Sequence, residues 1–455
     1  MRRILGFYFA ILALTVTGLA AQESGIAVSY ERLVLPNGLN VILHEDHTTP
    51  MVAVNVWYHV GSGREQPGRT GFAHLFEHIM FEGSGHVAEG KFDEWLEAAG
   101  GVNNGSTNTD RTNYFETVPN SALELALFLE SDRMGYLLDA MSPAKVDGQR
   151  DVVKNERRFR IENRPYGQAF IAISENLYPP DHPYHWPVIG SMEDLTAASY
   201  EDVVQFHQTF YVPSNASLSI AGDIDPEQVK RLVQHWFGDV AAGAAVAPLD
   251  GPAAYIAAEK RVVMEDRVQL PRIYMCWLTP RLYAPGDAEL DIAGAVLSRG
   301  KNSRLYKRLV YDMQIAQNVS AFQSSAELGS EFCIMSTARS GHDLNELEAV
   351  IQEELDKLKA EGPTGREVQR AINQYEAGFL SRMESLMGKA DQLNGYYFRT
   401  GNPDYFNEDL ARYRALDPAD VQSVVKTQLR NNARVILSIV PQGKPELAAS
   451  KKTSE

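Results

Sequence analysis

Two histidines and a glutamate stand at helical spacing early in the chain. His74, Glu77 and His78 belong to the stretch 72–80, and side chains three or four positions apart share one face of an α-helix. Two imidazoles one turn apart can bind a single zinc ion, and a carboxylate between them is placed to accept a proton from water. This His-x-x-Glu-His order is the inverted form of a zinc-binding pattern. A chain with 11 histidines can also produce it by chance, as two solvated imidazoles on a surface helix.

The helix that carries these residues has the features needed to anchor it. Thr70 is placed to cap its first turn, and Gly83 follows where a helix often ends. An apolar stripe on another side can pack into a core. The stripe consists of Phe72, Phe76, Ile79 and Met80.

A third metal ligand has to come from a distant part of the chain. Our candidate is Glu156, 78 residues beyond His78, on a helix predicted over residues 144–162. Gln149 lies two turns earlier on the same face of that helix. Spacing alone favours a different interpretation, in which Glu156 is a solvated helix carboxylate.

A polar, alternating strand is predicted over residues 106–118. It carries Thr107, Asp110 and Thr112 among other polar side chains, as is typical of a sheet edge. An edge strand can bind an extended peptide, which joins the sheet as a further strand. A plain solvated edge explains the pattern equally well.

The chain divides into two similar halves. Residues 241–256, rich in Ala, Gly and Pro, form the clearest linker. Strands alternate with helix pairs on both sides of it, which predicts an α+β fold of two mostly antiparallel sheets packed with helices and facing each other as a clamshell. We expect residues 22–240 to form the domain with the candidate zinc site and residues 257–442 a similar, non-catalytic domain, because the motif is not repeated. The charged tail 443–455 is expected to be disordered.

Composition and charge exclude several classes of protein. With 455 residues, 44% hydrophobic and 22% charged, the chain has the composition of an ordinary globular protein that can build large cores. A net charge of −16 argues against non-specific binding to nucleic acid or to anionic membranes.

The first 21 residues have the features of a signal peptide: a basic start, an uncharged apolar run over residues 4–19, and small residues at a cleavage point. A membrane anchor is the alternative, but the run is short for a span. We expect removal of residues 1–21, no stable membrane insertion afterwards, and a periplasmic or secreted protein. Cys276 and Cys333 can form one disulfide there or remain two buried thiols.

Taken together, the motifs resemble those of the pitrilysin-type (M16, inverzincin) zinc metallopeptidases. The resemblance is to the short two-domain kind (M16B), which includes the mitochondrial processing peptidase β subunit, and it covers nearly the whole chain after residue 21. Its anchors are residues 71–78; Gly100 and Gly101 with Asn104, Thr107, Asp110, Thr112 and Tyr114; residues 152–156; and residues 303–306.

The resemblance implies a zinc-dependent endopeptidase with one Zn²⁺ ion per chain, bound by His74, His78 and Glu156. Glu77 would act as general base in peptide-bond hydrolysis. Family members often carry a glutamate seven residues before the metal-binding one; Gln149 stands there, so the support of the ligands is expected to differ. The family lays its substrate along a sheet edge, which assigns peptide binding to Asn104, Thr107 and Asp110.

One departure from the family concerns the partner. Active single-chain members carry an Arg and a Tyr, seven positions apart, in the second domain, where this chain has Val310 and Gln317. In two-subunit relatives a homologous partner supplies these groups, so we expect this chain to be the zinc-bearing subunit of a heterodimer. A shifted register that uses Arg308 or Tyr311, a self-sufficient homodimer, and an inactive binding or scaffold relative are the alternatives.

Overall fold

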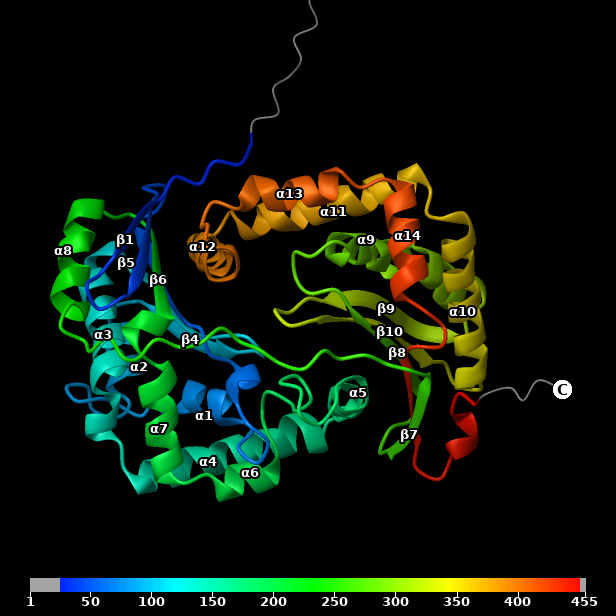
Figure 1. The fold of residues 1–455 in the computed structure, drawn as a ribbon, viewed down its shortest axis with the longest axis horizontal. Coiled ribbons are helices and arrows are strands. Elements are labelled where there is room, and N and C mark those ends of the chain that lie inside the picture. Colours follow the sequence, from blue (N-terminus) through cyan, green and yellow to red (C-terminus); the bar gives the residue numbers. More distant parts are fainter. Residues whose placement is uncertain (1–24, 451–455) are drawn as a thin grey trace, which may run out of the picture.

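Each half of the chain is built on one β-sheet (Figure 1). The computed structural model describes residues 25–450, so the predicted signal peptide lies outside the described residues. The first sheet has the order β1-β2-β6-β3-β5-β4, with β2 and β6 parallel and the other neighbours antiparallel. Its strands are β1 (Glu31–Val34), β2 (Asn40–Glu45), β3 (Met51–Tyr58), β4 (Val102–Thr107), β5 (Thr112–Pro119) and β6 (Ala216–Gly222).

The second sheet repeats this arrangement in the order β7-β11-β8-β10-β9, again with one parallel pair, β7 and β11. Counted from the parallel pair to the edge, its strands match β2, β6, β3, β5 and β4 of the first sheet. The predicted α+β class with two similar, mostly antiparallel sheets is therefore confirmed. The strands are β7 (Lys260–Asp266), β8 (Arg272–Thr279), β9 (Ala316–Ser324), β10 (Ser330–Ala338) and β11 (Val435–Pro441).

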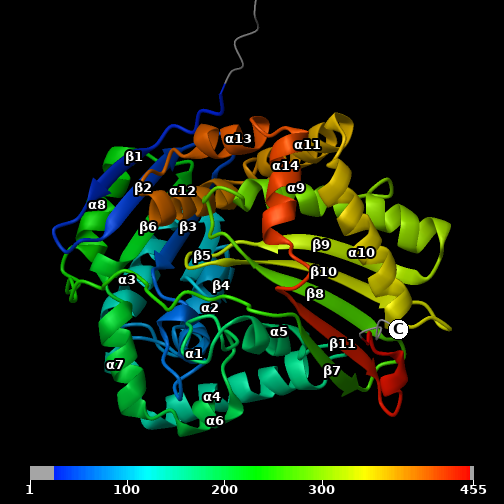
Figure 2. The ribbon, with the colours of Figure 1, turned by 45° about the vertical axis from the view of Figure 1, so that its right-hand side comes forward.

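Helices cover both faces of each sheet, and the two halves face each other as a clamshell (Figure 1 and Figure 2). The first half contains α1 (Phe72–Ile79), α2 (Lys91–Ala98), α3 (Leu123–Ala140), α4 (Pro143–Arg157), α5 (Ala169–Leu177), α6 (Met192–Ala197), α7 (Tyr200–Phe210) and α8 (Pro226–Phe237). The second half contains α9 (Asp287–Ser298), α10 (Leu344–Glu361), α11 (Gly365–Arg382), α12 (Leu386–Thr400), α13 (Phe406–Arg414) and α14 (Pro418–Gln428).

Each half contributes one helix to the sheet of the other half. Side chains alternate along β3, so Val54 faces the core that includes α3, whereas Ala53 faces the other way and meets Ala390 of α12. In return α5 packs on β8 and β11, where its Ile173 shares a cluster with Tyr274. Figure 1 and Figure 2 both place α12 beside β6 and α5 beside the second sheet.

The two cysteines form a disulfide between neighbouring strands of the second sheet. Cys276 on β8 and Cys333 on β10 are directly opposite each other and buried. The structure thus decides between the two states that the sequence left open. No helix within residues 25–450 is both long and apolar enough to cross a membrane.

Two expectations about chain segments are wrong. The predicted strand 106–118 is a hairpin of β4 and β5, because the Asn108 side chain accepts hydrogen bonds from the N–H groups of Asp110 and Arg111 (both 2.8 Å) and turns the chain. The tail is ordered over residues 443–450: Ala449 is buried, and its N–H donates to Ser438 Oγ (3.1 Å). Residues 451–455 lie outside the part that the structure describes.

Candidate metal centre

The N-terminus of α1 is fixed by two acidic side chains, the buried Glu65 and the partly buried Asp194. The Glu65 carboxylate accepts hydrogen bonds from the N–H groups of Gly71 (2.9 Å) and Ala73 (2.8 Å), which are free at a helix start. Thr70, which we expected to cap the helix, does not do so; its N–H and hydroxyl donate to Asp194 instead (3.0 and 2.6 Å). The sequence offered no signal for Glu65, because it reaches the helix from a loop outside the usual capping position.

The apolar stripe of α1 is buried as predicted. Tyr114 of β5 adds a hydrogen bond from its hydroxyl to the Phe76 carbonyl (3.0 Å), which ties the helix to the sheet. This packing fixes the rotation of the helix, so the opposite face carries its polar side chains toward α4. The stripe residues Phe72, Phe76, Ile79 and Met80 are each at most 2% exposed.

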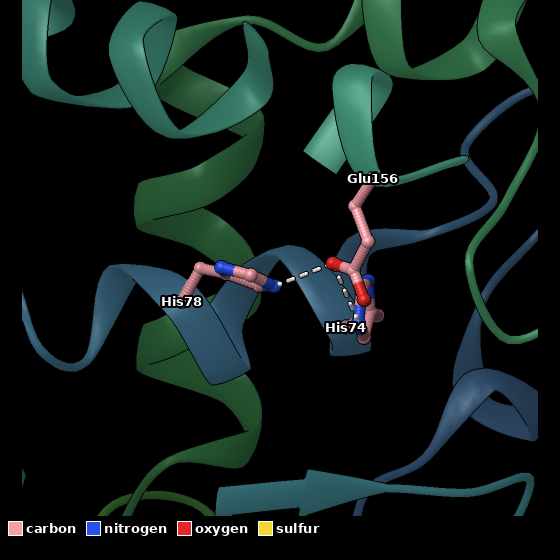
Figure 3. A group of neighbouring side chains, drawn as sticks. All are labelled: His74, His78 and Glu156. Atoms are coloured by element: carbon pink, nitrogen blue, oxygen red, sulfur yellow. Dashed lines mark hydrogen bonds and ion pairs between the residues drawn. The ribbon is translucent and has the colours of Figure 1, made fainter. Parts of the chain in front are cut away.

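The structure brings the three candidate ligands together (Figure 3). His78 Nε2 lies 3.1 Å from Glu156 Oε2, and His74 Nε2 lies 3.7 Å from the same oxygen. All three ligand atoms are within 4.8 Å of one another. The histidines come from α1 and the glutamate from α4, whose side chain points down onto the pair. The other oxygen of Glu156 forms an ion pair with Arg160 Nη1 (2.7 Å), a contact that the sequence did not reveal.

The chemistry of this donor set fits a zinc ion. Two imidazole nitrogens and one carboxylate oxygen are ligands that zinc prefers, and three protein ligands leave a fourth position open, as in catalytic zinc sites. Burial lowers the pKa of His74, an effect that the Glu77 charge opposes, so burial favours the neutral imidazole that a metal requires. The three side chains are only 12–25% exposed, so water competes little with the ligands.

Glu77 lies on the same side of α1, beneath the edge strand β4. A Cβ atom at Gly105 of β4 would come within 3.1 Å of Glu77 Cγ, so the absence of a side chain there leaves room for the carboxylate. Within residues 25–450 this carboxylate makes no hydrogen bond or ion pair. It is therefore free to accept a proton.

The three residues assigned to peptide binding have different surroundings. Asn104 is exposed on β4, which is the edge of the first sheet. Thr107, also on β4, lines the cleft with His74. Asp110 is only 6% exposed and accepts hydrogen bonds from the Tyr184 hydroxyl (2.5 Å) and the Glu327 N–H (3.1 Å). Both oxygens are thus occupied within the protein, one by Tyr184 of the first half and the other by Glu327 of the second half, which contradicts the assignment of Asp110 to substrate contact.

Gln149 supports the turn after α1. Its side-chain amide donates to Glu82 Oε1 (2.5 Å), and Lys145 donates to the Glu82 carbonyl (2.6 Å). Both residues come from α4, so this helix supplies Glu156 and also braces the segment that follows His78. Burial raises the pKa of Glu82, an effect that Lys145 and the hydrogen bond from Gln149 oppose.

Four residues of the second half were considered for the roles of the family's Arg and Tyr, and their surroundings argue against such a role at this site. Val310 packs against the second core, and Gln317 is exposed on β9. Arg308 pairs with Glu353 and Glu354, which engages its guanidinium and argues against a shifted register. Tyr311 is 73% exposed. Among the described residues, none of these four lines the cleft that contains His74.

The candidate metal centre opens into a cleft of about 650 Å³ between the halves. His74, Glu156 and Thr107 line it from the first half, and Arg272, Tyr274 and Glu331 are among its lining residues from the second half. Several aromatic side chains complete the walls, which is typical of a ligand-binding cleft.

The fold and this ligand set define a class of protein: two similar α+β halves with an inverted zinc motif on the first. The chain belongs to peptidase family M16. Residues 40–173 match the family described as "Insulinase (Peptidase family M16)", and residues 197–375 match the "Peptidase M16 inactive domain". The second match agrees with the lack of a repeated His-x-x-Glu-His in the second half.

Relatives of known name are similar over most of their length. "Zinc protease PqqE" from Helicobacter pylori is 29% identical over 421 residues, which cover 90% of this chain and 93% of the relative. "Probable mitochondrial-processing peptidase subunit beta" from Arabidopsis thaliana is 24% identical over 422 residues, which cover 90% of this chain and 77% of the relative. The crystal structure of a protease from Helicobacter pylori has a TM-score of 0.85 at 26% identity, and covers 91% of this chain and 100% of its own. The family resemblance is thereby confirmed, and zinc and peptidase activity are supported for the family in general.

Proposed function

We propose that this protein is a zinc-dependent endopeptidase that hydrolyses peptides or unfolded segments. The single observation that carries the proposal is the meeting of His74, His78 and Glu156 from two helices, beside the unpaired carboxylate of Glu77. We place the chemistry in residues 22–240, and give residues 257–442, beyond the linker 241–256, a non-catalytic role.

The mechanism assigns a task to each residue of this chain. Zinc, when bound, supplies a Lewis acid that activates water and polarises the scissile carbonyl. Glu77 accepts the proton of the attacking water and returns it to the leaving amine. The edge strand β4 can pair with an extended substrate, since its outer N–H and C=O groups are not used by another strand of the sheet. A cleft enclosed by both halves favours peptides or unfolded segments over folded proteins.

The second part of the proposal concerns a partner subunit. Val310 cannot donate a hydrogen bond, and Arg308 is held by Glu353 and Glu354 away from the cleft, so this chain lacks a group that the family's reaction uses. We infer that a homologous M16 subunit supplies the Arg and the Tyr. Loss of one oxyanion donor typically costs on the order of 10²–10³ in rate, so the chain alone should turn over slowly. A self-sufficient homodimer is the second candidate, and an inactive scaffold the third.

The proposal includes export to the periplasm or the medium. It is supported by the signal-like residues 1–21 and by the disulfide between Cys276 and Cys333, because disulfides persist in oxidising compartments.

Zinc analysis combined with Glu77→Gln tests the proposed activity. We expect about one zinc per chain in both proteins, and slow cleavage of a long unstructured peptide that the substitution abolishes. Addition of a homologue that lacks His-x-x-Glu-His but carries the Arg and Tyr should raise the rate at least a hundredfold. Full turnover by the purified chain would contradict the heterodimer, and a rate indifferent to Glu77→Gln would contradict the peptidase.

A further inference from the structure

The cleft contains an acidic side chain that the proposed chemistry does not use. Glu331 is the second residue of β10 and lines the same cleft as His74 and Glu156. Its neighbours across the sheet are Leu278 on β8 and Ser324 on β9, both uncharged. The Tyr178 hydroxyl, at the end of α5, is its hydrogen-bonding partner.

Within residues 25–450, no cationic side chain forms an ion pair with this carboxyl. Burial raises its pKa to about 7, opposed only by the hydrogen bond from Tyr178. The cationic side chains of the cleft are engaged elsewhere or exposed. Arg160 pairs with Glu156, and Arg272 donates to Thr337 Oγ1 (2.8 Å). Arg164 is exposed.

A carboxylate that is largely withdrawn from water and has no counter-charge is costly, and Glu331 is partly buried at the cleft wall. Positions of this kind are over-represented in binding and active sites. The aromatic walls nearby suit a positive group, because Tyr and Phe rings attract cations at their faces. Phe170 and Tyr274 pack edge to face with their centroids 5.8 Å apart, and Phe170 is 48% exposed. The cleft thus offers an acidic group and aromatic surface to a substrate that enters it.

We propose that Glu331 is a specificity-determining residue that binds a cationic group of the peptide substrate, an ammonium or a guanidinium, in the cleft shared with the metal centre. This inference rests on the proposed function, because it takes the ligand of the cleft to be a peptide. It assigns a binding role to the second half, which supplies no metal ligand. The cation comes either from a Lys or Arg side chain or from the free N-terminus of the peptide.

The test measures binding rather than turnover, so that it stays separate from the test of activity. The zinc-loaded Glu77→Gln variant is titrated with fluorescent peptides of one sequence that carry Lys, Arg, Gln or Glu at one scanned position, each with a free or an acetylated N-terminus. We expect at least one cationic peptide to bind about tenfold tighter than its neutral counterpart. Adding Glu331→Gln should remove that preference and leave the affinity for neutral, acetylated peptides within about twofold.

Glu327→Gln is the matched control, because Glu327 lies in the same β9–β10 hairpin, has a partly buried carboxyl, and does not line the cleft. It should keep the preference. Tighter binding of the acetylated Lys or Arg peptides identifies a side chain as the source of the cation. Tighter binding of the peptides with a free N-terminus identifies the N-terminal ammonium as the source. Either result supports the proposal. Equal binding of all peptides, no binding at all, a preference for Glu, or a cation preference that survives Glu331→Gln would each overturn it. Thermal unfolding of each variant verifies that the fold is kept.

Discussion

Replacing Gly105 by alanine should displace the proposed general base without touching a metal ligand. The added Cβ would stand 3.1 Å from Glu77 Cγ, whereas ordinary contacts lie at 3.4–4 Å, so the Glu77 side chain has to shift by a few tenths of an ångström. A misplacement of about 1 Å can cost about 10²-fold in rate. We therefore expect kcat/KM to fall roughly threefold to tenfold for Gly105→Ala, and further for Gly105→Val.

The assay is peptide cleavage with zinc content measured on the same samples. Zinc should remain at the wild-type level, because His74, His78 and Glu156 are unaffected. Gly148→Ala is the matched control: a Cβ there meets nothing within 4 Å, and alanine favours the α4 helix by about 1 kcal/mol. A wild-type rate for Gly105→Ala, or a rate loss that follows zinc loss, would refute the reasoning. The added Cβ also comes within 3.3 Å of Tyr114 Cδ1, so the unfolding temperature is recorded alongside.

Three further outcomes are expected. Arg160→Ala should weaken zinc binding about tenfold in a chelator competition, because it releases the outer oxygen of Glu156; unchanged affinity would show that the ion pair does not orient the ligand. For Glu331 the folded pKa, about 7, lies above the usual 4.5, so stability falls as pH rises through that window; Glu331→Gln should be more stable than wild type by up to about 3 kcal/mol at pH 8 and nearly equal at pH 4.5 in urea unfolding. Serine at Cys276 and Cys333 should cost about 4 kcal/mol, given their sequence separation of 57 positions, and an unchanged unfolding free energy would count against a constraint on the unfolded chain.

Local spacing predicted the candidate metal-binding face of α1, but not the whole candidate ligand set. His74 and His78 are one turn apart, and their shared face follows from helix geometry alone. Glu156 is 78 residues from His78, and only the family resemblance selected it among many helix carboxylates. Arg160 and Gly105 were missed because their importance lies in contacts across elements that no local pattern encodes.

The errors at the sheet edge and the helix start have local causes. The period-two alternation of polar residues continued through the turn at Asn108, so two strands were taken for one. Asp110 consequently fell in a turn that joins the halves, and not on the edge strand. At α1 the usual capping position drew attention to Thr70, whereas Glu65 reaches the same N–H groups from outside that position.

An amphipathic pattern shows that a helix has an apolar face, but not which sheet that face covers. The sequence therefore did not reveal the exchange of α5 and α12 between the halves. If the polypeptide were cut within 241–256 and one fragment produced alone, a sheet face would lose its covering helix. This apolar face would be exposed to solvent and prone to aggregate. The two fragments made in the same cell should instead find each other and reassemble, so the boundary that looks like a domain border divides a single cooperative unit.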